Sequence, residues 1–174
     1  TAPSWLYEVK KGANTVWETW DGINEKGEVH ASLNHYSYGS VVEWVYRYVL
    51  GFRVDEADPG AKHLNIAPSY NWNLKEAAGN FDSAAGNYKV AWKIVDPTQV
   101  SLSVQVPFDA SADIVLADAV EDTYADKENP LFADVCDGVC HVGSGTYEIR
   151  YQVKTALKKS YSTYSTVREL RSNA

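Results

Sequence analysis

The fold is decided by residues 88–106, which read YKVAWKIVDPTQVSLSVQV. Apolar and polar side chains alternate in both halves of this stretch, and such alternation predicts two half-buried β-strands. Residues 96–99 separate the halves and contain the Asp-Pro pair that favours a hairpin turn. The same alternation returns in residues 113–116 and 147–153. Short, half-buried strands joined by turns predict an antiparallel β-sandwich.

Before these strands, the apolar residues follow the spacing of helices. Ser4 is suited to cap a first helix, which Lys11 and Gly12 end. A second helix is predicted over residues 37–50, with Gly51 as the residue that follows its C-terminus. This helix is apolar on more than one side, so we expect it to lie between neighbours that the sequence does not contain.

The predicted domain organisation follows from these changes of pattern. Helices occupy residues 1–54, and residues 55–60 form a linker by composition. The sandwich occupies residues 61–154 and carries a long acidic insertion in its last hairpin, near residues 118–141. Residues 155–174 form a tail. The chain is therefore predicted to be an α+β multidomain fragment.

Composition excludes several classes of partner. The formal net charge is −7 over 174 residues, and nucleic acid is not expected as a partner because phosphate binding relies on clustered Lys and Arg. The chain has no signal-peptide pattern and no apolar run long enough to span a bilayer, so no membrane partner is expected. It contains no Met and begins with Thr1, which leads us to expect a piece of a longer polypeptide.

Two cysteines, Cys136 and Cys140, are separated by three residues in the acidic insertion. A local disulfide that closes the loop is the preferred interpretation, and two free thiols are the alternative. A disulfide would indicate an oxidising compartment, so the expected location inclines to secreted or extracytoplasmic. Zinc needs about four ligands, and only His141 and Asp134 or Asp137 lie nearby, so neither a metal site nor any other cofactor is expected.

The residues best suited to chemistry lie in residues 16–39. Glu18 stands between Trp17 and Trp20, in a piece that we expect to be extended or irregular. Apolar ring faces stack on the C–H surfaces of sugars while a few polar groups fix the hydroxyls. The segment therefore indicates a carbohydrate site. Glu18 is the candidate base, from whose surroundings the two indoles would exclude water, and His35 is a candidate hydrogen-bonding partner of the sugar. The structural alternatives are an ion pair or helix terminus for Glu18 and a core histidine for His35.

Several blocks of this chain closely resemble the C-terminal part of bacterial and fungal α-L-rhamnosidases. The resemblance covers roughly residues 3–153 and is strongest over the first 68. The blocks are SWLY (4–7), GANTVWETWDG (12–22), SLNHYSYGSV (32–41), EWVYRY (43–48), PGAKH (59–63), IAP (66–68) and GSGTY (143–147).

The resemblance implies that the helices are the last ones of an (α/α)6 barrel and that an antiparallel β-sandwich follows. It also implies hydrolysis of terminal α-L-rhamnosides with inversion. Glu18 aligns with the family's general base, His35 with a histidine that contacts rhamnose, and Trp20 with the aromatic lining of the pocket, which Trp17 would help to shape. The general acid lies outside this chain, so the implied partners are a rhamnose-containing glycoside and the rest of the barrel, and the 174 residues alone are expected to be inactive.

Two other functions remain open from the sequence. The sandwich could be a non-catalytic carbohydrate-binding module, with the helices as a connector. Alternatively, the chain could be a structural domain that needs an upstream partner, in which case its exposed apolar helix faces should cause it to aggregate or dimerise.

Overall fold

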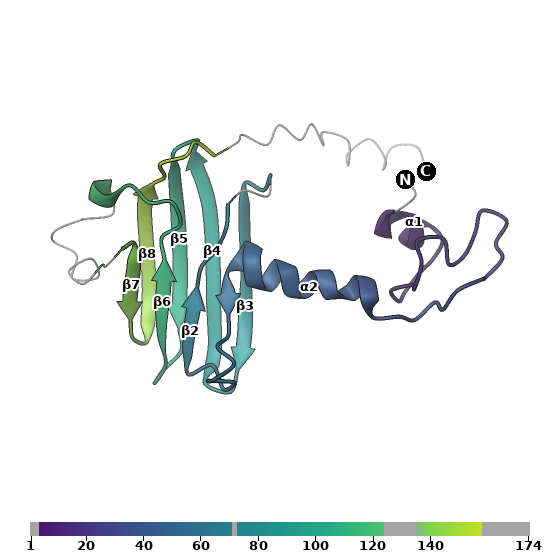
Figure 1. The fold of residues 1–174 in the computed structure, drawn as a ribbon, viewed down its shortest axis with the longest axis horizontal. Coiled ribbons are helices and arrows are strands. Elements are labelled where there is room, and N and C mark those ends of the chain that lie inside the picture. The colour runs from purple at the N-terminus through teal and green to yellow at the C-terminus, as the bar shows by residue number, and fades with distance from the viewer. Residues whose placement is uncertain (1–3, 71–72, 124–134, 136, 158–174) are drawn as a thin grey trace. The chain divides into compact units, whose positions relative to one another are not determined.

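The computed structural model describes residues 4–70, 73–123, 135 and 137–157 (Figure 1). The chain divides into two compact units, Thr1–Val45 and Tyr46–Ala174, which we call the N-terminal unit and the C-terminal unit. Among the described residues, no helix is both long and apolar enough to cross a membrane.

Helix α1 of the N-terminal unit spans Trp5–Lys10. The side chain of Ser4 caps it by accepting a hydrogen bond from the backbone N–H of Tyr7 at 3.3 Å, which confirms the predicted start. Gly12 follows the end of the helix with a φ of +87°, and its N–H donates to the carbonyl of Val9 at 3.0 Å. The predicted end of the first helix is therefore also confirmed.

The chain between this helix and the next has no regular helix or strand. A single antiparallel bridge, Ile23 with Val29, closes a turn in it, in agreement with the irregular, turn-rich connection that the sequence predicts. Helical structure resumes with the 3₁₀ turn η1 (Ser37–Ser40) and continues through helix α2 (Val41–Trp44).

The helical run ends in the π-helical turn η2 (Val45–Leu50), so the predicted second helix, residues 37–50, is confirmed in extent. Gly51 follows it with a φ of +86°, a conformation that side-chain-bearing residues avoid. A Cβ atom at Gly51 would lie 2.3 Å from the backbone nitrogen of Pro68. The chain can turn here and pack this closely only because the residue is glycine.

One sheet of the C-terminal unit, which we call the antiparallel sheet, has the order β3-β4-β5-β8. Its strands are β3 (Glu76–Ser83), β4 (Gly86–Asp96), β5 (Gln99–Val106) and β8 (Gly145–Gln152). All neighbouring pairs are antiparallel, and β4 and β5 are joined by the predicted turn, with Val90 opposite Val104. The alternation seen in the sequence thus gives this sheet one apolar face.

The second sheet, the mixed sheet, has the order β1-β2-β6-β7. It consists of β1 (Phe52–Arg53), β2 (His63–Ile66), β6 (Ser111–Val115) and β7 (Val139–Val142). The pairing of β2 with β6 is parallel, whereas that of β6 with β7 is antiparallel (Figure 1). Strand β1 pairs with β2 in the antiparallel direction. The prediction of a wholly antiparallel sandwich was therefore wrong for the pair of β2 and β6.

The core of the C-terminal unit lies between the two sheets. From the antiparallel sheet, the Tyr88 hydroxyl donates to the carbonyl of Ala61, just before β2, at 2.9 Å, and the buried Tyr151 hydroxyl donates to that of Tyr70 at 3.0 Å. Trp92 anchors the end of the helical run, because its indole N–H donates to the carbonyl of Val49 at 2.8 Å. Buried polar groups are thus paired, as a well-packed core requires.

The mixed sheet also corrects the predicted connections. The strand predicted at residues 113–116 does not form a hairpin with residues 147–153, because β6 pairs with β7 and β8 lies in the other sheet. The predicted linker, residues 55–60, connects the paired strands β1 and β2 and so lies inside the C-terminal unit. Asp58 orders it by accepting the backbone N–H of His63 at 2.8 Å.

Parts of three predictions fall outside the described residues. These are the acidic insertion over residues 124–134, the tail from residue 158 onward, and Cys136. The short turn η3 (Glu121–Thr123) and strand β7 are the described parts of the insertion. The wider assignment of residues 1–54 and 61–154 to separate domains stays a prediction.

Candidate functional site

Two segments of the N-terminal unit lie side by side and form the candidate site. The backbone N–H of Glu18 donates to the carbonyl of Ser32 at 2.9 Å, and that of His35 donates to the carbonyl of Val16 at 2.8 Å. The hydroxyl of Thr15 also donates to the carbonyl of Leu33. These bonds cross-link residues 15–18 to residues 32–35, so they bring Glu18 and His35, two residues singled out from the sequence, into one corner.

The Glu18 side chain is exposed and is oriented by its neighbour across this corner. Its Oε2 atom accepts a hydrogen bond from the backbone N–H of Ser32 at 3.1 Å. Glu18 and Ser32 therefore hold each other through two bonds, one from each backbone N–H. The contact uses Oε2, which leaves Oε1 to accept a proton from a water molecule.

Trp17 occupies a different environment from the one expected. It is only 1% exposed and is the large buried side chain of the N-terminal unit, whereas the adjacent Glu18 is exposed. Successive side chains of extended chain point to opposite sides, so burial of the indole turns the carboxylate outward. Within this chain, Trp17 supports the segment from beneath the surface and does not share open surface with Glu18.

Trp20 belongs to a group of three aromatic rings. Its indole is half-buried and stacks on the ring of Tyr38, with centroids 4.0 Å apart and an interplanar angle of 9°. The ring of Trp5 meets it edge-on at 5.2 Å. The sequence pointed to Trp20, but nothing in its spacing indicated Trp5, because residues far apart in the chain form this contact.

His35 is half-buried, and its ring has a defined donor and acceptor arrangement. The Nδ1 atom accepts from the backbone N–H of Ser37 at 3.2 Å and lies 2.9 Å from the Ser37 hydroxyl. Acceptance at Nδ1 places the proton of a neutral imidazole on Nε2, which can then donate to a ligand hydroxyl. The ring is also stacked on Tyr36, with centroids 5.1 Å apart.

Sequence analysis missed two residues that hold this corner together, Ser32 and Glu8. Glu8 is only 2% exposed, and its Oε2 atom accepts the backbone N–H of Trp17 at 3.4 Å. The helical spacing of α1 gives no sign that Glu8, rather than Leu6 or Val9, is its buried residue. In the structure those two residues are 53% and 64% exposed.

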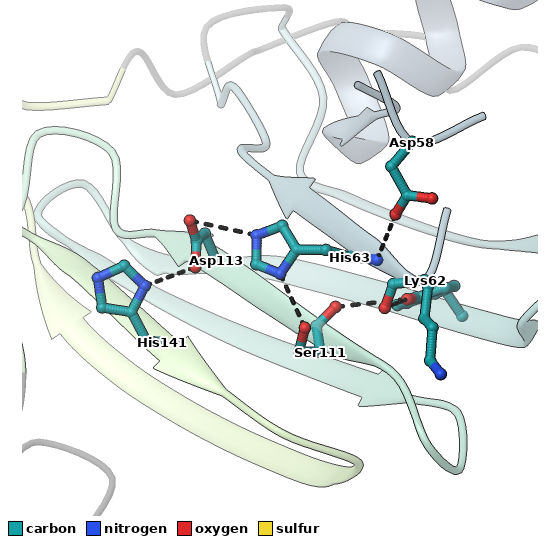
Figure 2. Close-up of polar contacts among 7 residues, drawn as sticks. Asp58, Lys62, His63, Ser111, Asp113 and His141 are labelled. Carbon is teal, nitrogen blue, oxygen red and sulfur yellow. Dashed lines mark hydrogen bonds and ion pairs between the residues drawn. The ribbon is translucent and has the colours of Figure 1, made fainter. Parts of the chain in front are cut away.

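The C-terminal unit carries a second polar cluster, on β2, β6 and β7 (Figure 2). The Asp113 carboxylate meets two imidazoles, with Oδ2 3.3 Å from His63 Nε2 and Oδ1 2.5 Å from His141 Nδ1. The other ring nitrogen of His63 lies 2.8 Å from the hydroxyl of Ser111. The ring nitrogens of the two histidines thus contact the Asp113 carboxylate and, for His63, also the Ser111 hydroxyl. These contacts join three neighbouring strands of the mixed sheet.

The remaining predicted site concerns the cysteines and metals. Cys140 on β7 is buried, and burial raises the pKa of its thiol to about 11. Its proposed disulfide partner Cys136 lies outside the described residues, so the pair stays a prediction. Over the described ranges, no group of three or more His, Cys, Asp or Glu side chains is arranged to hold a metal ion.

The outer face of the antiparallel sheet has a shallow depression of about 410 Å³. Its floor is made of small residues, Ala78 and Ala91, and its rim includes Glu76 and Lys93, whose charged groups lie 3.7 Å apart. Trp92 borders it but is only 2% exposed. The depression therefore offers no open aromatic face on which a sugar ring could stack.

The sequence was compared with known protein families and with known proteins. Residues 1–49 match the family described as the bacterial alpha-L-rhamnosidase 6 hairpin glycosidase domain, and residues 51–130 match the bacterial alpha-L-rhamnosidase C-terminal domain. An alpha-L-rhamnosidase from Alteromonas is 37% identical over 66% of this chain, and one from Formosa agariphila is 34% identical over 74%. The chain belongs to the α-L-rhamnosidase family.

A solved structure agrees with this rhamnosidase assignment. The alpha-L-rhamnosidase of Streptomyces avermitilis, crystallised with L-rhamnose, matches 88% of the chain with a TM-score of 0.66 and 30% identity. The match covers 15% of that protein, and the chain spans 13% and 14% of the Alteromonas and Formosa rhamnosidases. It therefore corresponds to a small part of its relatives.

The family matches divide the rhamnosidase chain close to where its compact units meet. Glu18, Trp17, Trp20 and His35 all fall in the match to the hairpin glycosidase domain, which ends at residue 49. The cluster around Asp113 falls in the match to the C-terminal domain. The sequence placed this boundary later, at residue 54, because it did not recognise β1 as a strand of the mixed sheet.

Proposed function

We propose that this chain is part of an α-L-rhamnosidase that hydrolyses terminal, non-reducing α-L-rhamnose from glycosides with inversion, and that Glu18 is its general base. The observation that carries the proposal is the geometry of Glu18. Its carboxylate is exposed, it falls in the match to the glycosidase domain, and one of its oxygens is fixed by the backbone N–H of Ser32.

In an inverting glycosidase, a carboxylate removes a proton from water as that water attacks the anomeric carbon. A carboxylic acid about 6.5–9.5 Å away protonates the leaving oxygen on the other side of the sugar. In our proposal Oε1 of Glu18 accepts the water proton while Oε2 stays bonded to Ser32. The acid comes from another part of the enzyme, and the reaction needs no cofactor.

The neighbours of Glu18 have different parts in this proposal. The Nε2 atom of His35 donates a hydrogen bond to a rhamnose hydroxyl, because Nδ1 is already occupied by Ser37. Trp20, half-buried and held against Tyr38, offers its remaining aromatic surface to the apolar side of the sugar. The role of Trp17 is indirect, because its buried indole fixes the segment that carries Glu18.

We also propose that the helices of the N-terminal unit are the last helices of an (α/α)6 barrel. The support is their unburied apolar surface, because Leu6, Val9 and Val42 are all more than half exposed. Exposed apolar helix faces of this kind are normally covered by neighbouring helices. The rest of the barrel would supply that cover together with the general acid.

A sandwich that binds carbohydrate without catalysis is the less favoured function. The depression on the antiparallel sheet lacks an exposed aromatic ring, and the aromatic residues around Glu18 lie in the other unit. Titration calorimetry of the isolated 174-residue chain with L-rhamnose separates the two. A half active site should give no measurable heat, whereas a binding module should bind as a fragment.

The decisive test is Glu18→Gln in the complete enzyme that contains this chain. The amide keeps the size of the side chain and can still accept the Ser32 N–H, but it cannot remove a proton from water. We expect kcat on an aryl α-L-rhamnoside to fall by about 10³-fold, with a modest change in KM. Glu25→Gln, in an exposed turn of the same unit, is the matched control and should keep full activity.

Two further measurements complete this test. The anomer first released, followed by NMR, should be opposite to that of the substrate if hydrolysis inverts. The isolated chain should not cleave rhamnosides, because it lacks the acid. Near-normal turnover by Glu18→Gln would remove Glu18 from the mechanism.

A further inference from the structure

Glu8 is a buried carboxylate that the proposed mechanism does not use. It is only 2% exposed and is the one charged side chain among the described residues that is fully buried. Its Oε2 atom accepts the backbone N–H of Trp17, and its Oε1 atom is buried with no hydrogen-bond partner. Burying a carboxylate is costly, so such a group needs an explanation.

An ion pair does not provide that explanation. Lys11, about one helical turn beyond Glu8, directs its ammonium to the carbonyl of Asn24 at 3.3 Å and lies over the ring of Tyr7 at 5.6 Å. Apolar packing does not provide it either, because a leucine of similar size would fill the space without a desolvation cost. What Glu8 does supply is an acceptor for a backbone N–H that no strand or helix serves.

That N–H belongs to the residue directly before Glu18. On one side of the segment, Glu8 holds the peptide of Trp17. On the other side, Ser32 holds both the backbone and the carboxylate of Glu18. The two contacts together fix the short stretch of chain on which the proposed base sits.

We propose that Glu8 is a positioning residue, whose buried carboxylate fixes the Trp17 peptide and thereby aims the Glu18 carboxylate at the attacking water. The inference rests on the proposed function of Glu18 and goes one step beyond it. Glu8 touches neither sugar nor water. Its effect is on the position of a catalytic group, and small errors in such positions cost large factors in rate.

The placement of Glu8 determines which kinetic constant it controls. A general base acts on water in the transition state, so a misplaced base lowers kcat. Substrate affinity depends on the sugar contacts, which in our proposal come from His35 and Trp20. Loss of the hydrogen-bond acceptor that Glu8 provides should therefore lower kcat and leave KM nearly unchanged.

The test compares Glu8→Ala with Glu8→Gln in the complete enzyme. We expect Glu8→Ala to lower kcat by about 10- to 100-fold, with KM changed less than about threefold. Glu8→Gln should restore most of kcat, because its amide oxygen can accept the Trp17 N–H. Glu25→Ala is the control for loss of a carboxylate in the same unit, and thermal unfolding shows that each variant is folded.

A double variant separates positioning from general structural damage. If Glu8 acts through Glu18, then adding Glu8→Ala to Glu18→Gln should lower the residual kcat no further. Equal losses in both backgrounds, failure of Glu8→Gln to restore kcat, or wild-type kcat in Glu8→Ala would each overturn the positioning role. If Glu8→Ala is normal while Glu18→Gln is inactive, only this inference fails. A fully active Glu18→Gln instead refutes the proposed function itself.

Discussion

The two units of this chain differ in how much of their apolar surface they bury. Among the described residues, the C-terminal unit buries nearly all of the core, including Trp92, Tyr88, Tyr151 and Leu102, between two hydrogen-bonded sheets. The N-terminal unit buries one large side chain, Trp17, and leaves Leu6, Val9 and Val42 exposed on its helices. One unit has a core of its own, and the other leaves much of its apolar helix surface uncovered.

The proposed catalytic residues do not lie in the unit that buries most of the apolar core. All the residues proposed for catalysis lie in the N-terminal unit, on irregular chain that is fixed by a few hydrogen bonds between its segments. Functional side chains commonly lie on such loops, held by a more rigid scaffold. In our proposal the rest of that scaffold comes from the remainder of the barrel, so measurements on the 174 residues alone should report mainly on the sandwich.

Two glycines give the largest test of this comparison, because both follow a helix with nearly the same φ, +87° for Gly12 and +86° for Gly51. A Cβ at Gly12 meets nothing within 4 Å, whereas one at Gly51 lies 2.3 Å from Pro68. Gly12→Ala should cost about 1 kcal/mol of local strain. Gly51→Ala should lower the free energy of unfolding by about 3 kcal/mol, because strain and overpacking add.

Chemical denaturation of the 174-residue chain, followed by tryptophan fluorescence and circular dichroism, measures both changes. The main cooperative transition should shift strongly for Gly51→Ala and hardly at all for Gly12→Ala. Equal shifts would mean that the N-terminal unit is as well packed as the sandwich, which would contradict the comparison.

The pH dependence of stability gives a second, smaller effect that belongs to the sandwich. Burial raises the pKa of the Cys140 thiol to about 11, and burial also raises the pKa values of Tyr70 and Tyr151. As the pH rises, these three side chains therefore stay protonated in the folded protein after the same side chains of the unfolded chain have begun to lose their protons. The contribution of Cys140 to stability should be complete below about pH 9 and should be lost as the pH rises through about 11. The contribution of the two tyrosines should begin to fall only near pH 10.

Denaturation midpoints measured from pH 7 to pH 10.5 test this expectation. Cys140→Ala should lower stability at all pH values but flatten the decline that begins near pH 9. In a Cys136→Ser background, the Cys140 thiol should react with a thiol reagent only on unfolding. Alkylation of the denatured, unreduced wild type tests the predicted disulfide, because a Cys136–Cys140 pair would leave neither cysteine open to modification.

The comparison also shows what the sequence could predict. Alternation revealed β4, β5 and most of β8, because their inner positions are large and apolar and their outer ones polar. It missed β3, whose sequence EAAGNFDS offers one large apolar residue, Phe81. It missed β1, β2 and β7, which are two to four residues long. Pairing with distant strands, rather than local propensity, makes these segments strands.

The candidate site was predictable to a similar, partial extent. Glu18, His35 and Trp20 were found because their residue types suit sugar chemistry and because the motif resembles a family. The supporting contacts of Glu8 and Ser32 were not found, since they join segments that lie far apart in sequence. The side to which Trp17 points also depended on tertiary packing, which the motif does not encode.

The smallest expected effect on stability concerns two aspartates that contact histidines. One aspartate lies in each unit. Asp113 joins His63 and His141 across three strands and is largely shielded from solvent, whereas Asp21 meets His30 at 3.6 Å with both side chains well exposed. Asp113→Ala leaves two imidazole nitrogens without their acceptor, so it should lower the free energy of unfolding by about 1 kcal/mol. Asp21→Ala should change it by less than about 0.5 kcal/mol, because exposed pairs contribute little. Thermal unfolding at pH 7 ranks the two variants. A larger loss for Asp21→Ala would place the stabilising polar contacts in the unit with the smaller core.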